Sequence, residues 1–132
     1  MVPVYDTCDT VRRKIRAHLR KDGVTQAAFL RAITATAFPD GRRRPAASSF
    51  NNFLKLKGPL AGNANAVFYA AYVFFEKLRI KEKKPKSKDR EVMEERWSPG
   101  GVDIERPEGK NGYWCRENER PVMDKYGTLT FQ

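Results

Sequence analysis

Apolar residues recur at helical spacing along the first part of the chain. A first amphipathic helix is predicted over residues 7–21, with Asp6 or Thr7 as its N-cap and Asp22-Gly23 as its stop, because glycine accepts the left-handed conformation that ends helices. Its apolar positions lie three or four residues apart, and basic residues fill most of the others. These apolar positions are Cys8, Val11, Ile15 and Leu19.

Two shorter helices follow. Thr25 can cap a helix over residues 26–34, and Ser48 or Ser49 can cap another over residues 48–57, which ends at Gly58-Pro59. Between them, residues 35–47 contain two prolines and an arginine triplet, so we expect an exposed basic loop there. The apolar face of the second helix consists of Phe29, Leu30 and Ile33, and that of the third of Phe50, Phe53, Leu54 and Leu56.

A fourth helix is predicted over residues 65–83. Apolar side chains lie nearly all round it, so it either forms the centre of a small bundle or buries a spare face against a partner or against the C-terminal segment. The predicted fold class is therefore mainly α, a small four-helix bundle of the helix-turn-helix (repressor-like) type.

The C-terminal third differs in composition from the rest. Residues 1–84 are predicted as a basic helical domain, residues 85–99 as a charged linker, and residues 100–132 as an extension that packs on the helices. The charged stretch from Lys81 to Arg96 is expected to be either a solvated linker or a ragged helix, because Pro85 ends the fourth helix. Strand-forming content over residues 112–116 and 126–131 predicts a short β-hairpin in this extension. We expect it to be anchored by Tyr113, Trp114 and Phe131.

Charge is unevenly distributed along the 132 residues, whose net charge is +10. Residues 1–90 hold 20 basic and 7 acidic side chains, whereas residues 91–132 hold 6 and 9. A surface this basic attracts polyanions, and the attraction belongs to the helical part of the chain.

The helical pattern and the charge together predict nucleic-acid binding. In a helix-turn-helix module the N-terminal turn of the second helix meets base edges, and asparagine can form a bidentate pair with adenine. The predicted base-contacting residues are Ser48, Ser49, Asn51 and Asn52. As an alternative, the serines are only helix caps and the asparagines are only solvated.

Basic side chains around this helix are predicted to hold phosphates, which position a protein on nucleic acid without reading its sequence. They are Arg12, Arg13, Arg16, Arg42, Arg43, Arg44, Lys55, Lys57, Lys81, Lys83 and Lys84. The long connection over residues 35–47 argues against a simple helix-turn-helix, whose turn is usually about three or four residues. Either this loop is an insertion that itself contacts DNA, or the helices pack in an arrangement other than a helix-turn-helix.

Other function classes find little support in the sequence. With one histidine and two distant cysteines, the chain contains no zinc or nucleophilic catalytic set, and its glycines match no nucleotide-binding motif, so we expect no enzyme, no cofactor, no metal and no small-molecule substrate. His18 is expected to be a partly buried structural residue. No apolar run is long enough to span a membrane, and no signal peptide is recognised, so we expect a reducing intracellular location, the nucleus, with free thiols at Cys8 and Cys115.

Two alternative functions remain open at this stage. The aromatic face of the fourth helix, at Phe68, Tyr72 and Phe75, could form a homodimer or bind a protein partner, with the charge giving only solubility. RNA is a less favoured ligand than double-stranded DNA. It would be bound through stacking on exposed aromatic residues, for which Tyr69, Tyr72, Tyr113 and Trp114 are the candidates.

Several segments resemble an uncharacterised family of fungal proteins. The resemblance rests on residues 5–15, 23–29 and 68–79, and extends to 112–116 and 124–127. This family is defined as a domain of unknown function, so the resemblance implies a fungal, nuclear protein and one domain of a longer polypeptide. Together with the expected DNA binding, it suggests a transcription-related protein. It brings no catalytic or binding residue to assign.

Overall fold

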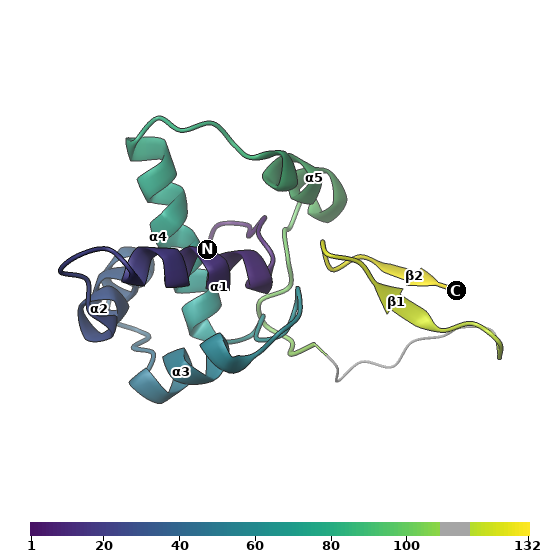
Figure 1. Ribbon diagram of the computed structural model, residues 1–132, viewed down its shortest axis with the longest axis horizontal. Helices are drawn as coiled ribbons and strands as arrows, with labels where there is room; N and C mark the ends of the chain where they lie inside the picture. The colour runs from purple at the N-terminus through teal and green to yellow at the C-terminus, as the bar shows by residue number, and fades with distance from the viewer. Residues whose placement is uncertain (109–116) are drawn as a thin grey trace.

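The computed structural model describes residues 1–108 and 117–132, which form five helices and a two-stranded antiparallel hairpin (Figure 1). The mainly helical class and the C-terminal hairpin were both predicted and are confirmed. The helices are α1 (Cys8–Leu19), α2 (Gln26–Ala37), α3 (Ala47–Lys55), α4 (Ala66–Lys81) and α5 (Lys88–Trp97), and the strands are β1 (Pro121–Met123) and β2 (Leu129–Phe131).

Helix α4 is the centre of the helical part. Its residues from Val67 to Val73 are all buried, and α1, α2 and α3 each contact it. In Figure 1, α1 crosses α4 and α3 lies near its N-terminal end, while α2 packs along α4 from Tyr69 to Lys77. The absence of a polar stripe on this helix is thereby explained, because neighbours surround its first half and cover every face.

Polar side chains start four of the five helices. Thr7, Thr25, Asn65 and Ser87 each accept a hydrogen bond from a backbone N–H of the first turn, at distances of 2.9–3.1 Å. Helix α3 is the exception, because it begins one residue before Ser48, with Ala46 at the N-cap and no side-chain cap bond. The predicted capping role of Ser48 or Ser49 is therefore wrong, because neither hydroxyl caps the helix.

The predicted linker over residues 85–99 contains α5, so of the two expected alternatives the helix is correct, and it is packed on the protein instead of solvated. Met93 of this helix is 2% exposed, and Arg90 forms ion pairs with Glu76 of α4 at 2.7 Å and with Glu94 at 2.8 Å. The Arg90 guanidinium also lies over the rings of Tyr5 and Tyr72. Sequence patterning did not show that this helix packs on the protein, because one buried methionine among charged residues gives no apolar stripe.

The segment after α5 returns to the N-terminus. The backbone N–H of Val102 donates to the carbonyl of Val4 at 2.8 Å, and a Cβ at Gly101 would lie 2.5 Å from the Val4 nitrogen, so only glycine fits this approach. Buried Asn63 then holds residues 103–108 through two donated hydrogen bonds and one accepted one. The C-terminal extension is thus attached to both the N-terminus and the loop before α4.

The hairpin differs from the prediction in its first strand and its anchor. Strand β2 falls within the predicted 126–131 and pairs with β1 at 121–123, while the predicted strand over 112–116 lies wholly outside the described residues, as do Tyr113 and Trp114. Phe131 is 42% exposed and does not anchor the hairpin. The hairpin turn contacts α5 instead: the backbone carbonyl of Tyr126 accepts a hydrogen bond from the Trp97 indole at 2.9 Å, and Asp124 pairs with Arg96 at 2.6 Å.

Candidate nucleic-acid interface

The outer face of α3 is polar. Phe50 and Phe53 turn inward and are 1% and 0% exposed, which fixes the helix on the body of the protein. The opposite positions are exposed and lie three or four residues apart, so they form one stripe along the helix. This polar stripe consists of Ser48, Asn51, Asn52 and Lys55. Ser49 is half-buried beside it, and its carbonyl accepts a hydrogen bond from the side chain of Asn65.

The loop before α3 is shaped by a tight turn. Phe38 ends α2 and accepts a hydrogen bond at its carbonyl from the N–H of Gly41, whose φ of 75° suits glycine. Asp40 completes the turn by accepting from the N–H of Arg42 at 3.1 Å and pairing with its guanidinium at 2.9 Å. The turn sends the arginine triplet outward, immediately before α3, and all three side chains are exposed.

Basic side chains flank the polar stripe at both ends. Arg43 and Arg44 precede its first residue. Neither forms an ion pair with an acidic side chain of residues 1–108 or 117–132. At the other end, Arg16 of α1 donates to the carbonyl of Leu54 and remains exposed, beside exposed Lys55 and Lys57. Five cations thus surround a helix of nine residues, which is about 13 Å long.

Arg12 is not part of this interface, and its predicted phosphate contact is wrong. The residue is 1% exposed, and its guanidinium donates to the carbonyls of Phe53, Gly58 and Ala61 and to the carboxylate of Asp9. These bonds join α1 to the end of α3 and to the loop that follows it. A phosphate cannot reach a guanidinium whose donors are already used inside the protein.

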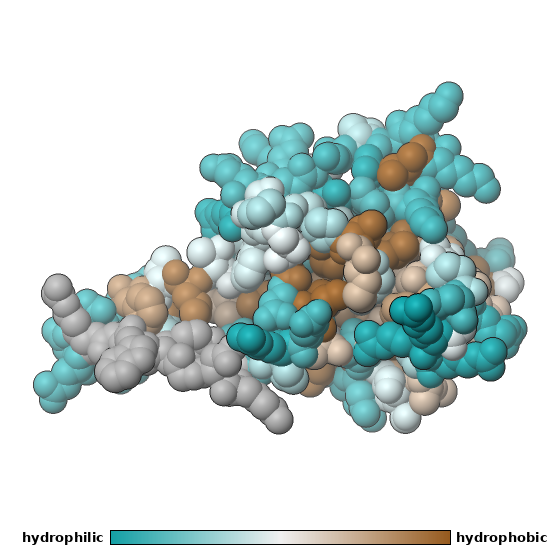
Figure 2. Space-filling view, turned by 180° about the vertical axis from the view of Figure 1, so that it is seen from behind, coloured by the Kyte–Doolittle hydropathy of each residue, from teal (hydrophilic) through white to brown (hydrophobic). Residues whose placement is uncertain are grey.

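Other predicted phosphate contacts lie elsewhere on the molecule. Arg13 faces a hollow between α1, α4 and α5 that it shares with the acidic residues Asp6 and Asp89. Lys81, Lys83 and Lys84 are exposed at the C-terminal end of α4, about 24 Å from the end beside α3. Figure 2 shows this upper part of the molecule as mostly hydrophilic. The structure therefore separates a second basic region from the α3 surface.

The aromatic partner surface predicted on α4 is also corrected. Phe68 is fully buried, Tyr72 is 2% exposed, and Phe75 is half-buried against His18 and Phe29. Tyr69 is 5% exposed and accepts a hydrogen bond from the N–H of Val2, so neither tyrosine of α4 can stack on a base. The other proposed stacking residues, Tyr113 and Trp114, lie outside the described residues.

The remaining titratable candidates have structural surroundings. Burial raises the pKa of the Cys8 thiol to about 12, and Cys115 is outside the described residues. His18 is half-buried among the rings of Phe29, Phe74 and Phe75, at centroid distances of 5.2–5.8 Å, and burial lowers its pKa, with a further lowering by Lys21. No cluster of metal-ligating side chains occurs among the residues that the structure describes, and none of the helices described is long and apolar enough to cross a membrane.

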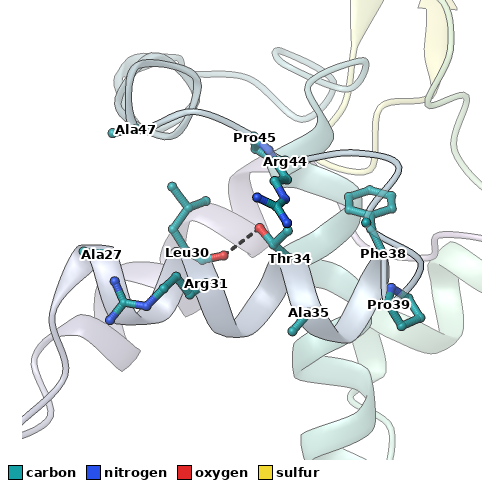
Figure 3. A pocket seen from close by; sticks show the side chains of 11 residues that line it. Ala27, Leu30, Arg31, Thr34, Ala35, Phe38, Pro39, Arg44, Pro45 and Ala47 are labelled. Carbon is teal, nitrogen blue, oxygen red and sulfur yellow. Dashed lines mark hydrogen bonds between the residues drawn. The ribbon is translucent and has the colours of Figure 1, made fainter.

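Sequence reasoning missed an apolar groove on the outer side of α2 (Figure 3). Helix α2 runs to Ala37, three residues past its predicted end, and its extension completes a second, outward-facing stripe of small and apolar residues. The signal was present in the three- and four-residue spacing of Ala27, Leu30, Thr34 and Phe38. The stripe was not recognised because the predicted helix ended at Thr34 and left Phe38 outside it.

Comparison with known proteins identifies a family without a known activity. A family model described as a domain of unknown function (DUF7726) matches residues 2–85, which includes α1 to α4 and excludes the C-terminal extension. No curated protein and no solved structure gives a significant match to the chain. Since the match covers more than half of the chain, this protein belongs to the DUF7726 family.

Proposed function

We propose that this protein binds double-stranded DNA, with α3 in the major groove and the flanking basic residues on the phosphates. The observation that supports it most directly is the polar stripe of Ser48, Asn51, Asn52 and Lys55, with cations at both of its ends. In this proposal α2, the loop over residues 38–46 and α3 act as a helix-turn-helix with a lengthened turn. A nuclear location would follow from such a ligand.

The dimensions of the surface agree with those of the ligand. The major groove is about 12 Å wide and admits one α-helix, and α3 is about 13 Å long. Cations at the two ends of such a helix lie where the phosphates of the groove walls would pass. The asparagine amides on the stripe can donate to and accept from base edges, whereas Arg43, Arg44, Arg16 and Lys57 are suited to phosphate oxygens.

Arg42 can join this set despite its bond to Asp40. Its side chain is 85% exposed and that of Asp40 is 52% exposed, and ion pairs this exposed contribute little to stability. A phosphate can therefore replace the carboxylate. Asp40 is the only acidic residue between Gly23 and Lys57, so the surface offers little repulsion to a polyanion.

The proposal predicts a specific change in salt dependence. We expect binding of a fluorescent random-sequence duplex whose log affinity falls linearly with log salt concentration, because phosphate contacts release counterions. Changing Arg43 and Arg44 together to alanine should reduce the slope by about 1.8, at roughly 0.9 per lost contact. Fluorescence anisotropy across a salt series measures both quantities.

The matched control is the double change of Lys83 and Lys84 to alanine. It removes the same charge from the far end of α4 and should leave the slope nearly unchanged. Equal loss of slope in the two variants would show that net charge, and not the α3 surface, attracts the duplex. Absence of binding at low salt would remove the DNA proposal altogether.

A further inference from the structure

The groove on α2 lies beside the polar stripe of α3, and Arg44 borders both. It has a volume of about 670 Å³ and lies between the outer face of α2 and the loop that leads to α3. Figure 3 shows Leu30, Thr34 and Ala35 along α2, with Phe38 and Pro39 at one end and Pro45 across from the helix. The hydroxyl of Thr34 donates to the carbonyl of Leu30 at 2.7 Å, so the floor offers almost no free polar group.

Two arginines stand at the margins of this apolar floor. Arg31 projects from α2 near Ala27, and Arg44 reaches over Thr34 from the loop (Figure 3). Both are exposed, and neither pairs with an acidic side chain in the described part of the chain. No acidic residue lines the groove. A ligand for this surface therefore combines apolar side chains with negative charge.

From this combination we infer that the groove binds a short, amphipathic, acidic helix of a partner protein. An apolar stripe on the partner would fill the space over Leu30 and Thr34, and carboxylates beside that stripe would pair with Arg31 and Arg44. A nucleic-acid duplex would satisfy the arginines but would gain nothing from the apolar floor. The inference does not depend on the proposed DNA binding.

The shape of the groove favours a helix as its occupant. The lining positions of α2, from Ala27 to Phe38, recur every three or four residues and extend over about 16 Å. Helix-in-groove recognition uses apolar anchors at positions i, i+3 or i+4, and i+7, which span a similar length. The small side chains of Thr34 and Ala35 leave room for such an anchor between the larger Leu30 and Phe38, and Ala27 leaves room for another before Leu30.

The test uses the full chain and two fluorescent peptides of about twelve residues, which match three turns of helix. One carries leucine at the anchor positions and glutamate elsewhere, and the other replaces every glutamate by lysine. Fluorescence anisotropy should show the acidic peptide binding at least about tenfold more tightly than the basic one. Equal affinities, or binding of neither peptide, would overturn the inference.

Three variants assign the binding to the groove. Ala35→Glu places a negative charge on an exposed position of the floor, and the double change of Arg31 and Arg44 to alanine removes both rim charges. Each should weaken the acidic peptide by about tenfold or more. The matched control, in which Lys81 and Lys83 become alanine, should not, and circular dichroism should show that all variants remain folded. Unchanged affinity in both groove variants would place the peptide elsewhere and refute the inference.

A second copy of this chain is the remaining alternative occupant. Sedimentation velocity on the unmodified protein distinguishes it. A monomer that binds the acidic peptide supports the inference, whereas self-association that Ala35→Glu abolishes would overturn it in favour of a homodimer.

Discussion

Replacing Arg12 by alanine is expected to destabilise the protein by about 3–5 kcal/mol, the size seen when one partner of a buried charged network is removed. The side chain is 2% exposed and donates to three backbone carbonyls as well as to Asp9. Its guanidinium also lies 4.9 Å from the centre of the Phe53 ring. Without it, the carbonyl of Ala61 loses the Arg12 donor, and the carbonyls of Phe53 and Gly58 keep only the bonds from the N–H groups of Leu56 and Ala61, both at 3.3 Å.

This loss is large compared with the roughly 5–15 kcal/mol that a domain has in total. Denaturant unfolding followed by circular dichroism measures it. Arg12→Lys should recover little of the loss, because one ammonium group cannot reproduce a planar fork that bonds in several directions. Arg13→Ala is the matched control, since this neighbour is exposed, and its effect should stay within about 0.5 kcal/mol. A loss below 1 kcal/mol for Arg12→Ala would contradict the structural role.

Replacing Glu76 by glutamine is expected to cost on the order of 2–3 kcal/mol near neutral pH and to loosen α5 from α4. Glu76 pairs with Arg79 at 2.6 Å and with Arg90 at 2.7 Å. Partial burial raises the pKa of Glu76, but the hydrogen bonds from Arg79 and Arg90 outweigh this and lower the pKa to about 2. Glutamine keeps the shape of the side chain and loses the charge that both arginines require.

The same group makes stability depend on pH. Because the pKa of Glu76 is lower in the folded than in the unfolded protein, its contribution is complete above pH 4.5 and is lost as the pH falls to about 2. Asp6 acts in the opposite sense, because burial raises its pKa against the lowering influence of Lys14, so its ionisation above pH 3.8 is unfavourable to the fold. We therefore expect acid destabilisation that Glu76 dominates in the lower part of this window.

Denaturant unfolding at a series of pH values tests this dependence. The difference in unfolding free energy between the parent and Glu76→Gln should shrink steadily from pH 5 to pH 2. Glu95→Gln, on the exposed side of α5, is the control and should follow the parent at every pH. A difference that stays constant with pH would mean that the carboxylate charge is not what holds α5.

Local rules predicted much of the helical part. Thr7, Thr25 and Asn65 were recognisable as starts of helices because a short polar side chain before an apolar-periodic run supplies the missing hydrogen-bond acceptor. The apolar spacing around Phe29 and Phe53 identified the inner faces correctly. The start of α3 was misplaced because serine is a common N-cap residue, whereas this helix begins after Ala46 without a side-chain cap hydrogen bond.

Other features depend on contacts between distant residues, which periodicity does not contain. Arg12 and Arg16 look alike in the sequence, one turn apart on α1, yet one is buried by the loop after α3 and the other is exposed. Arg13 is directed by the same helix toward α5 and its acidic residues. A charge count along the chain therefore assigns all three to one surface, and only tertiary structure separates them.

The polar stripe on α3 was predictable and the groove on α2 was not. The stripe follows from helical spacing once α3 is recognised. The groove requires the loop over residues 38–46 to fold back along α2, which depends on the turn that Asp40 and Gly41 form. That turn is a local structure, but where it sends Arg44 and Pro45 is a property of the assembled protein.

The hydrogen bond between Val102 and Val4 shows that the match to the family model and the buried interior of this protein end at different residues. The stretch shared with its family stops at residue 85, whereas the interior continues through Met93 and Val102, and the side chain of Asn63 needs the backbone of residues 103–108. A fragment cut at residue 85 would expose the surface around Tyr5 and Tyr72 that α5 now covers. The stretch that matches the family model therefore depends on the extension to cover part of its interior, although no helix or strand of the extension packs extensively on α3 in the described part of the chain.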